Sequence, residues 1–263
     1  MHNCDMNLSI AIATFNEEKN LAKCFDAVKD WAGEIVVVDG GSTDKTVEIA
    51  QKYTDKIIIT DNPPIFHLNK QKSLDACSGD WILQLDADEI VTPELKKEII
   101  EETRNSQPAT QKPINGYFLS RKNYFLGHWL KKGGLYPDYI LRLVKKNKAF
   151  FPCKSIHEQI KVTGEVGYLK NDFLHYTNST IADYWKNSID RNASLTAKEI
   201  IKTNKNNSLS LAFNYLIFLP IKWFYLRLIR HKGILDGIYG VIFALGSTLH
   251  YPVAYIKYLK LKK

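Results

Sequence analysis

The sequence predicts a three-layer α/β domain built on a mostly parallel central sheet, and two observations carry this prediction. Over the first hundred residues, short apolar runs alternate with segments whose apolar residues recur at helical spacing. A parallel sheet needs such crossover helices, which then cover its faces. In addition, a chain of 263 residues with 45% hydrophobic residues can bury a full core.

Four strands are expected in this region, and they lie at Leu8–Ala13, Glu34–Asp39, Lys56–Thr60 and Trp81–Leu85. Between the first two, Leu21 and Phe25 belong to a helical repeat of apolar residues. A mixed pattern of short β-like stretches follows from residue 115 to about residue 176. We assign both halves to one domain, residues 1–178.

The fourth expected strand runs directly into Asp86-Ala87-Asp88-Glu89. Carboxylates at the carboxyl end of such a strand project into the crevice where α/β sheets bind ligands. Mg²⁺ and Mn²⁺ prefer oxygen ligands, and they often bridge one or two carboxylates to substrate phosphates. An acidic turn that caps a helix beginning near Thr92 is the competing interpretation of this motif taken alone.

Polar residues also follow the first two strands, as Thr14-Phe15-Asn16-Glu17 and as Asp39-Gly40-Gly41-Ser42-Thr43-Asp44. Three strand ends with polar groups on one rim favour a ligand site over a simple cap. No G-x-G-x-x-G or Walker sequence follows any of these strands, so a dinucleotide or P-loop enzyme is disfavoured.

These motifs resemble the family 2 glycosyltransferases, which have the GT-A fold, a Rossmann-like, mostly parallel sheet flanked by helices. The resemblance covers residues 7–100 and rests on T-F-N-E, V-V-D-G-G-S-T-D, the Ala76–Trp81 approach and L-D-A-D-E. It implies transfer of a sugar from a nucleotide diphosphate donor, with inversion at the anomeric carbon and with Mn²⁺ or Mg²⁺ as cofactor.

The resemblance also implies roles for individual residues. Asp39 would hydrogen-bond the uracil edge, and Lys70 lies where many relatives carry an arginine beside the diphosphate. The expected donor-binding residues are Thr14, Asn16, Glu17, Asp39, Lys70 and Asp86. The expected metal ligands are Asp88, Asp86 and His175. For His175 the alternative is a buried, hydrogen-bonded histidine.

The catalytic base is expected in the second half of the domain. His157-Glu158 resembles the base motif of the family, although His-Glu departs from the usual Glu-Asp pair. Glu158 is the expected base, and Asp138, after the glycine loop, is its rival. Gly134 of that loop and Arg142 are expected to bind the acceptor. The basic residues of this region form either a solvated face or a site for an anionic acceptor.

The composition becomes membrane-like toward the C-terminus. We expect a connecting helix over residues 179–207 and a helical, membrane-associating appendage over residues 208–263. Glycines and Pro252 interrupt its longest apolar stretch, so two helices lying in the bilayer interface are favoured. A spanning or re-entrant hairpin and an oligomer interface are the alternatives. The net charge of +8 suits several polyanions and does not choose among them.

Gly233-Ile234-Leu235-Asp236-Gly237 and the basic tail resemble a bacterial subgroup of the family, the β-glucosyltransferases of the lipopolysaccharide inner core. This resemblance implies a UDP-sugar donor, an anionic glycolipid acceptor and the inner-membrane surface as partners, without nucleic acid. The four cysteines form no C-x-x-C pair, and the first residues lack a secretory signal pattern. We therefore expect a peripheral protein on the cytoplasmic face of the bacterial inner membrane.

Three other functions are compatible with parts of the sequence. A glycosyltransferase of this family could act on another acceptor, such as a polyprenyl-phosphate carrier. A sugar nucleotidyltransferase would carry a glycine-rich basic loop after the first strand, which is absent here. A membrane-bound binding module without enzymatic activity would leave Asp86 and Asp88 unexplained.

Overall fold

The computed structural model describes residues 7–104, 112–154, 158–203 and 209–262. By its internal contacts the chain divides into two compact units. The first, called here the sheet unit, comprises residues 1–121 and 138–175. The second, the helical unit, comprises residues 122–137 and 176–263.

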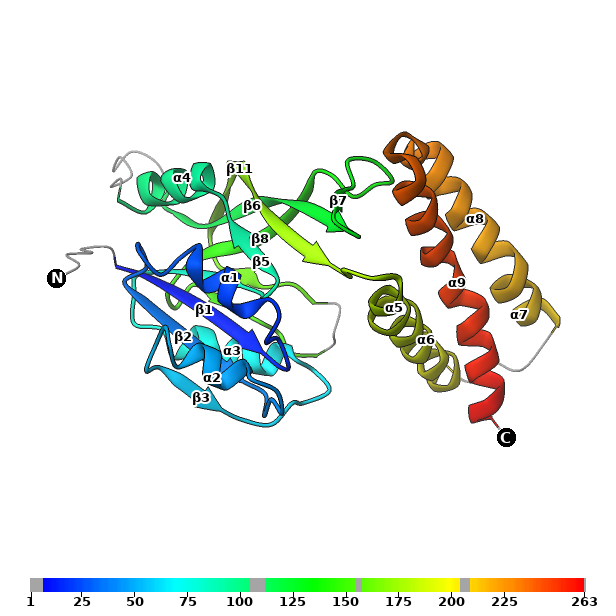
Figure 1. Cartoon of the computed structure of the whole chain (residues 1–263), viewed down its shortest axis with the longest axis horizontal. Helices are drawn as coiled ribbons and strands as arrows, with labels where there is room; N and C mark the ends of the chain where they lie inside the picture. Colours follow the sequence, from blue (N-terminus) through cyan, green and yellow to red (C-terminus); the bar gives the residue numbers. More distant parts are fainter. Residues whose placement is uncertain (1–6, 105–111, 155–157, 204–208, 263) are drawn as a thin grey trace. The chain divides into compact units, whose positions relative to one another are not determined.

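Within the described residues, nine strands form one sheet in the order β3-β2-β1-β4-β8-β6-β11-β5, with β7 paired to β6 (Figure 1). The strands are β1 (Leu8–Thr14), β2 (Glu34–Asp39), β3 (Ile57–Ile59), β4 (Trp81–Leu85), β5 (Glu89–Val91), β6 (Ile114–Phe125), β7 (His128–Trp129), β8 (Asp138–Lys145) and β11 (Glu165–Thr177). Strands β9 (Ala149–Phe150) and β10 (Lys161–Val162) form a separate antiparallel pair. Strands β3, β2, β1 and β4 are mutually parallel, whereas β8 joins β4 antiparallel.

Helices cover both faces of the parallel half of the sheet. They are α1 (Leu21–Asp26), α2 (Thr46–Ala50), α3 (His67–Asp75) and α4 (Pro93–Arg104). Because side chains alternate along a strand, Ile10 of β1 packs with Phe25 of α1, while Ala11 belongs to the opposite cluster with Leu74 of α3. The predicted α/β fold with helices on both faces of a mainly parallel sheet is confirmed.

The register of the parallel strands brings their carboxyl ends to one rim. Thr14 at the end of β1 lies opposite Asp39 at the end of β2. On the other side of β1, Ile12 lies opposite Leu85, the last residue of β4. The segments that follow these three strands therefore start side by side, as the sequence predicted.

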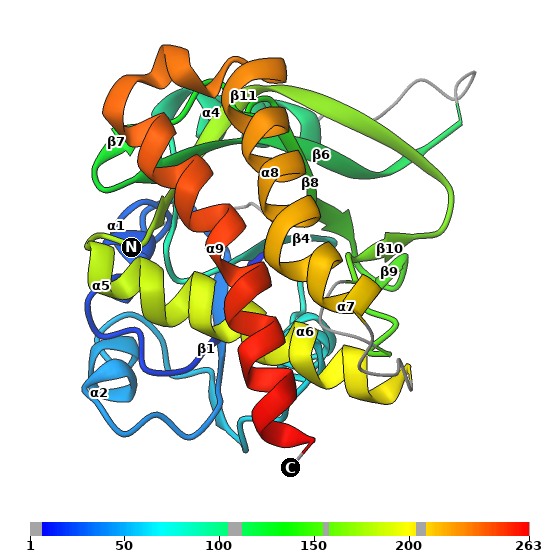
Figure 2. The same cartoon turned by 90° about the vertical axis from the view of Figure 1, so that its right-hand side faces the viewer.

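The helical unit contains β7 and the ends of β6 and β11, and its other described elements are helices and short turns of π- and 3-10-helix. These are α5 (Ile181–Asp183), η1 (Tyr184–Asp190), α6 (Arg191–Lys202), α7 (Leu209–Phe213), η2 (Asn214–Phe218), α8 (Leu219–Tyr225), η3 (Leu226–Arg230), η4 (Gly233–Asp236) and α9 (Gly237–Leu261). Helix α9 packs against α6 and α8, and Figure 2 shows it crossing α6. Gly246 of α9 permits a close approach, since a Cβ there would lie 2.1 Å from the ring of Tyr184.

The predicted segments 179–207 and 208–263 both fall in the helical unit. Two of its described helices, Leu209–Arg230 and Gly233–Leu261, are long and apolar enough to cross a membrane by length and composition. Both leave large apolar side chains in contact with solvent. On the first helix these include Phe213, Leu216, Ile217, Phe218, Ile221, Tyr225 and Ile229, and on the second Ile238, Leu245, Leu249 and Ile256.

The core of the sheet unit can be tested at Phe25, whose side chain is 0% exposed and lies 4.8 Å from the ring of Tyr53 between centroids. Phe25→Ala is expected to lower the free energy of unfolding by about 3–5 kcal/mol, through lost burial and a residual cavity. Ile59→Ala, at a position 58% exposed, is expected to stay within about 0.5 kcal/mol. Urea unfolding measures both, and equal losses would contradict this account of the core.

Candidate active site

The loops that follow β1 and β2 are joined by hydrogen bonds around Asp39. The carboxylate of this buried residue accepts the N–H groups of Gly41 at 2.9 Å and Ser42 at 2.7 Å, and the Ser42 hydroxyl at 2.6 Å. Asn16, at a positive φ of 55°, donates its N–H to Ser42 Oγ at 2.8 Å and accepts the N–H of Thr43 at 2.8 Å. The Asp39 carboxylate thus fixes the loop that follows β2. Its contact with a uracil edge stays a prediction.

Two buried polar atoms near this rim have no hydrogen-bond partner among the described residues. They are Oγ1 of Thr14, at the end of β1, and Oδ1 of Asn69, on α3. The amide nitrogen of Asn69 donates to the carbonyl of Asp61 at 2.8 Å, and a Cβ on Gly40 would lie 3.4 Å from that nitrogen. Buried polar groups are normally paired, so both oxygens suit hydrogen bonds to a polar ligand.

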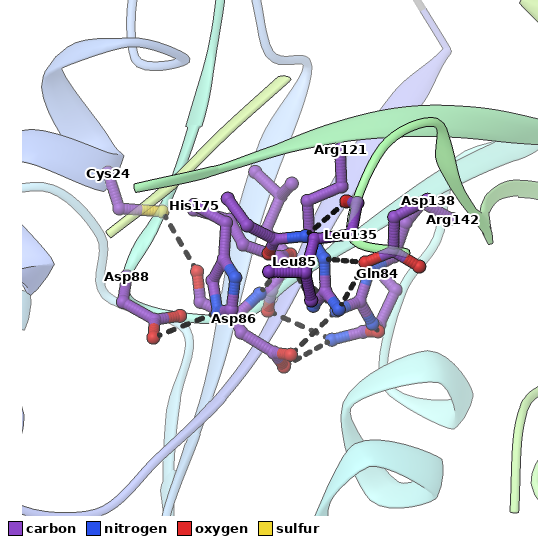
Figure 3. A network of polar contacts seen from close by, with 12 residues as sticks. Cys24, Gln84, Leu85, Asp86, Asp88, Arg121, Leu135, Asp138, Arg142 and His175 are labelled. Atoms are coloured by element: carbon purple, nitrogen blue, oxygen red, sulfur yellow. Dashed lines mark hydrogen bonds and ion pairs between the residues drawn. The ribbon is translucent and has the colours of Figure 1, made fainter. Parts of the chain in front are cut away.

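Arg142 connects the antiparallel half of the sheet to the acidic end of β4. Leu143 pairs with Leu83, so the preceding residue of β8 lies next to Gln84, whose side-chain oxygen accepts from the Arg142 guanidinium. The same guanidinium donates to Asp86 at 2.6 Å and to Glu89 at 2.6 Å (Figure 3). Arg142 is 5% exposed. It is therefore buried among carboxylates, and its predicted contact with the acceptor stays a prediction.

Two further cations complete this network. Lys70 of α3 forms an ion pair with the other carboxylate oxygen of Asp86. Arg121 of β6 donates to Asp138 at 2.9 and 2.7 Å and lies 3.8 Å from Glu89. Three carboxylates therefore face three cations, which is the balance that buried charges require.

The pKa shifts follow from this arrangement. Burial alone would raise the pKa of Asp86, but the Arg142 guanidinium and the Lys70 ammonium hold it well below its ordinary value. Burial raises the pKa of Glu89, with Arg142 opposing the shift. Burial also lowers the pKa of Lys70, against the attraction of Asp86. Asp86 is thus held ionised, with both of its oxygens occupied by cations.

Asp88 lies outside this network and faces a different partner. Its carboxylate oxygen is 3.3 Å from Nε2 of His175, and His175 pairs with Glu89 across β11 and β5. Burial raises the pKa of Glu17, and the negative charges of Asp88 and Asp86 raise it further. Glu17, Asp86 and Asp88 therefore lie close enough together on the rim for their charges to interact.

Of the predicted base and acceptor residues, Asp138 and Arg142 belong to this network, whereas Glu158 and Gly134 have other neighbours. Glu158 is half-buried, and its carboxylate accepts the N–H of Lys154 at 2.6 Å, while His157 of the same motif is outside the described residues. Gly134 belongs to the helical unit, where its positive φ of 76° and the nearby ring of His231 shape the glycine loop. The roles of Glu158, Asp138 and Gly134 stay predictions.

Much of the chain is similar to a known protein family and to known proteins. The model of glycosyl transferase family 2 matches residues 9–160, which include the whole rim. The chain belongs to this family. It is 29% identical to the lipopolysaccharide core biosynthesis glycosyltransferase LpsC of Rhizobium meliloti, over 92% of this chain and 88% of that protein.

Two further matches also cover most of this chain. An uncharacterized glycosyltransferase of Rickettsia typhi is 26% identical over 97% of this chain and 88% of that protein. Among solved structures, the crystal structure of S. aureus TarS matches 89% of this chain and 46% of that chain, with 18% identity and a TM-score of 0.46. The predicted membership of family 2 is confirmed.

Sequence reasoning on this glycosyltransferase missed three residues of the network. Glu89 was noted only as part of the acidic turn, Arg121 only as part of a basic region, and Gln84 only as a strand residue. A usable signal was present, since Gln84 interrupts an otherwise apolar strand and Arg142 lies within the apolar run 139–144. Polar residues at buried strand positions need partners, so these two could have been paired.

Removal of Arg142 is expected to destabilise the folded protein. Arg142→Met leaves Asp86 and Glu89 without their shared cation, so the free energy of unfolding should fall by about 3–5 kcal/mol near neutral pH. Asp86 has a depressed pKa in the folded state, so its contribution is present above about pH 3.9, the unfolded-state value, and is lost as the pH falls through the folded-state pKa. The deficit of the variant should therefore shrink on acidification.

Urea unfolding at several pH values measures this deficit. The matched control is Arg104→Met at an exposed position, which should change stability by less than about 0.5 kcal/mol. Adding Glu89→Gln to Arg142→Met removes one unpaired charge and should restore part of the loss. A deficit that stays constant from neutral to acidic pH would show that Arg142 acts through packing alone.

Proposed function

We propose that this family 2 glycosyltransferase transfers a hexose, glucose, from a UDP-sugar to a sugar hydroxyl of an anionic, lipopolysaccharide-core-type glycolipid, with inversion. The observation that carries the proposal is the rim of the sheet unit, where Asp86 and Asp88 meet the loops after β1 and β2. The acceptor class is supported by the similarity to LpsC, a protein of lipopolysaccharide core biosynthesis, over most of both chains.

In this proposal the donor nucleotide lies over the loops that Asp39 and Asn16 hold together. The unpartnered oxygens of Thr14 and Asn69 accept hydrogen bonds from the ligand, and Glu17 borders the same pocket. Lys70 is already fixed by Asp86 and lies where a diphosphate needs a cation. These contacts extend the donor-binding set predicted from the sequence by one residue, Asn69.

The residues around Asp88 fit a divalent cation that the donor phosphates help to hold. Asp88 and His175 supply an oxygen and a nitrogen ligand 3.3 Å apart, and Glu17 lies near enough for the charge of Asp88 to raise its pKa. The described residues contain no cluster of three His, Cys, Asp or Glu side chains that could hold a metal ion. Such incomplete sites suit Mg²⁺ or Mn²⁺, which keep waters and take substrate phosphates as ligands. The bound cation would stabilise the negative charge of the leaving diphosphate.

Asp86 is an electrostatic support in this scheme rather than an open ligand. Both of its oxygens are engaged, by Lys70 and by Arg142. Its fixed charge contributes to the field that attracts the cation and keeps Lys70 in place. Pre-positioned charges of this kind cost no reorganisation during the reaction.

The transfer itself needs a base for the acceptor hydroxyl. The hydroxyl oxygen attacks the anomeric carbon from the face opposite the leaving UDP, and the base takes its proton. Glu158 is our first candidate and Asp138 the second. Asp138 is held by two hydrogen bonds from Arg121, whereas the contact of Glu158 is to the Lys154 N–H. Proton transfer by a positioned base contributes about 10²–10⁴-fold to the rate.

The helical unit supports a peripheral position at the cytoplasmic face of the inner membrane. Its two long apolar helices expose large hydrophobic side chains, and extensive exposed apolar surface marks membrane or protein contacts. A turn that carries Arg230, His231 and Lys232 lies between them. Basic residues at that place suit anionic headgroups.

A polyprenyl-phosphate acceptor and a sugar nucleotidyltransferase reaction are the alternatives. Activity assays on truncated lipopolysaccharide cores and on polyprenyl phosphates separate the two acceptors. Release of free UDP, rather than pyrophosphate, is expected and excludes nucleotidyl transfer. A screen of UDP-, GDP- and dTDP-sugars for metal-dependent binding identifies the donor.

Asp88→Asn is expected to abolish Mn²⁺-dependent turnover of the UDP-sugar while leaving the fold intact, since the change removes the open carboxylate and keeps the shape of the side chain. Release of UDP measures activity, and thermal unfolding checks the fold. The control is Asp80→Asn, an exposed aspartate just before β4 that lies at the other end of the same strand. Normal metal-dependent turnover in Asp88→Asn would refute the metal assignment.

Glu158→Gln is expected to lose transfer by about 10²–10⁴-fold while keeping UDP binding, because the base acts on the acceptor and not on the donor. Asp138→Asn is the matched comparison. UDP binding is followed by calorimetry and transfer by release of UDP. If only Asp138→Asn loses transfer with UDP binding retained, Asp138 is the base and our first assignment is wrong.

A further inference from the structure

Arg227, in η3 of the helical unit, is a half-buried cation without an acidic partner among the described residues. Burial lowers the pKa of its guanidinium, and the groups that oppose this shift are the phenols of Tyr184 and Tyr251 rather than a carboxylate. Buried charges are normally paired, as Arg142 is in the sheet unit. The guanidinium of Arg227 therefore lacks the counter-charge that its burial calls for.

Aromatic rings line this guanidinium in place of a carboxylate. Its central carbon lies 5.1 Å from the centroid of the Phe243 ring and 5.9 Å from that of Trp223. Tyr184 stacks on Phe243 and donates its hydroxyl to the Phe243 carbonyl at 3.0 Å. Ring faces attract a cation but carry no net charge, so they offset only part of the cost of burial.

The carboxylate of the nearby turn is already engaged. Asp236 is 8% exposed, and its two oxygens accept the N–H groups of Lys131 at 3.2 Å and Lys132 at 2.8 Å. Backbone amides thus take up the charge of Asp236. A counter-charge for Arg227 is therefore expected from a bound anion.

The hydrogen-bonding capacity of Arg227 is mostly unused. A guanidinium carries several N–H donors in a planar fork. Within the described part of the chain, the hydrogen bond from this guanidinium runs to the carbonyl of Gly133 at 3.5 Å, longer than the usual range of about 2.7–3.2 Å. Phosphate and carboxylate groups match the fork and can accept two N–H groups at once. Phosphate has more acceptor oxygens, so it makes better use of the remaining donors.

The backbone around Arg227 is closely packed and holds the guanidinium in place. A Cβ on Gly233 would lie 2.6 Å from the Arg227 carbonyl oxygen, so this position needs glycine. The N–H of Gly133 donates to the carbonyl of His231 at 2.9 Å, and a Cβ on Gly134 would lie 3.5 Å from the His231 ring. The glycine loop is thus fixed against the turn that follows Arg227.

We propose that Arg227 binds a phosphate group of the glycolipid acceptor. The guanidinium contacts the glycine loop, in which Gly134 is expected to bind the acceptor. It also lies on a helix that exposes large apolar side chains, among them Tyr225 and Ile229. A cation at an apolar surface suits a phosphate that is joined to a lipid. This inference rests on the acceptor class of the proposed function and is independent of the donor and of the base.

The first measurement uses the full-length protein and inorganic phosphate, with sodium chloride of equal ionic strength as the reference. Phosphate is expected to raise the thermal unfolding temperature of the wild type more than that of Arg227→Met. Arg191→Met is the matched control, since it changes an exposed arginine of the same unit, and it should respond as the wild type does. In chloride, Arg227→Met should unfold at the wild-type temperature or above, because it removes a half-buried charge that has no counter-charge.

The second measurement is transfer to truncated lipopolysaccharide cores. Arg227→Met is expected to raise the KM for the acceptor about 10- to 100-fold, the range for a hydrogen bond to a charged group, and to leave the KM for the UDP-sugar unchanged. Arg227→Lys keeps the charge without the fork and should lie between the two. Enzymatic removal of phosphate from the core should raise the KM of the wild type and hardly affect Arg227→Met, because both changes remove one contact.

Several results would overturn the proposal. A lower unfolding temperature of Arg227→Met in chloride, together with the wild-type KM for the acceptor, would give Arg227 a structural role. A KM that responds to Arg227→Met but not to removal of phosphate would make the ligand a carboxylate. Weaker binding of Arg227→Met to phosphatidylglycerol vesicles, with an unchanged KM, would make a bilayer lipid the occupant. A wild type that transfers to no core would refute the proposed acceptor and this occupant, whereas the response to inorganic phosphate would still decide whether Arg227 is an anion site.

Discussion

The guanidinium of Arg142 is the interaction on which the arrangement of the rim depends. Two carboxylates, Asp86 and Glu89, lie within 2.6 Å of the same nitrogen of this buried side chain. Ionised carboxylates are costly to bury unless they are paired and hydrogen-bonded. Without Arg142, the two carboxylates after β4 would lack the cation that makes their burial favourable. Lys70 and Arg121 then complete the balance of charge from two other elements.

This pairing separates two carboxylates that lie in one acidic turn of the sequence. Asp86 is fixed between two cations, whereas Asp88 faces His175 and lies near enough to Glu17 to raise its pKa. A site with one fixed and one open carboxylate suits a divalent cation that arrives with a diphosphate. The same network reaches Asp138 through Arg121, so the second candidate base of our proposal and Asp86 share one set of buried charges.

The helical unit shows a second use of a buried carboxylate. The carboxylate of Asp236 accepts hydrogen bonds from the backbone N–H groups of Lys131 and Lys132. These bonds fix the backbone of the adjoining loop. The exposed apolar side chains of the two long helices and the basic turn between them are the features that we propose meet an anionic lipid bilayer.

The sequence by itself determined the strands and the acidic rim. Strands 34–39 and 81–85 have their predicted bounds, because hydrophobic periodicity is a local property of each segment. The motifs also identified the family, because they are contiguous. Only the tertiary structure decided the partners of those residues. Arg142 meets Gln84 from 58 positions away because β8 pairs with β4, and no local pattern specifies which strand becomes the neighbour of another. The partners of Glu89 and Arg121 were decided in the same way. A buried charge pairs with an opposite charge nearby, and strand pairing in the folded sheet determines which charges are near one another.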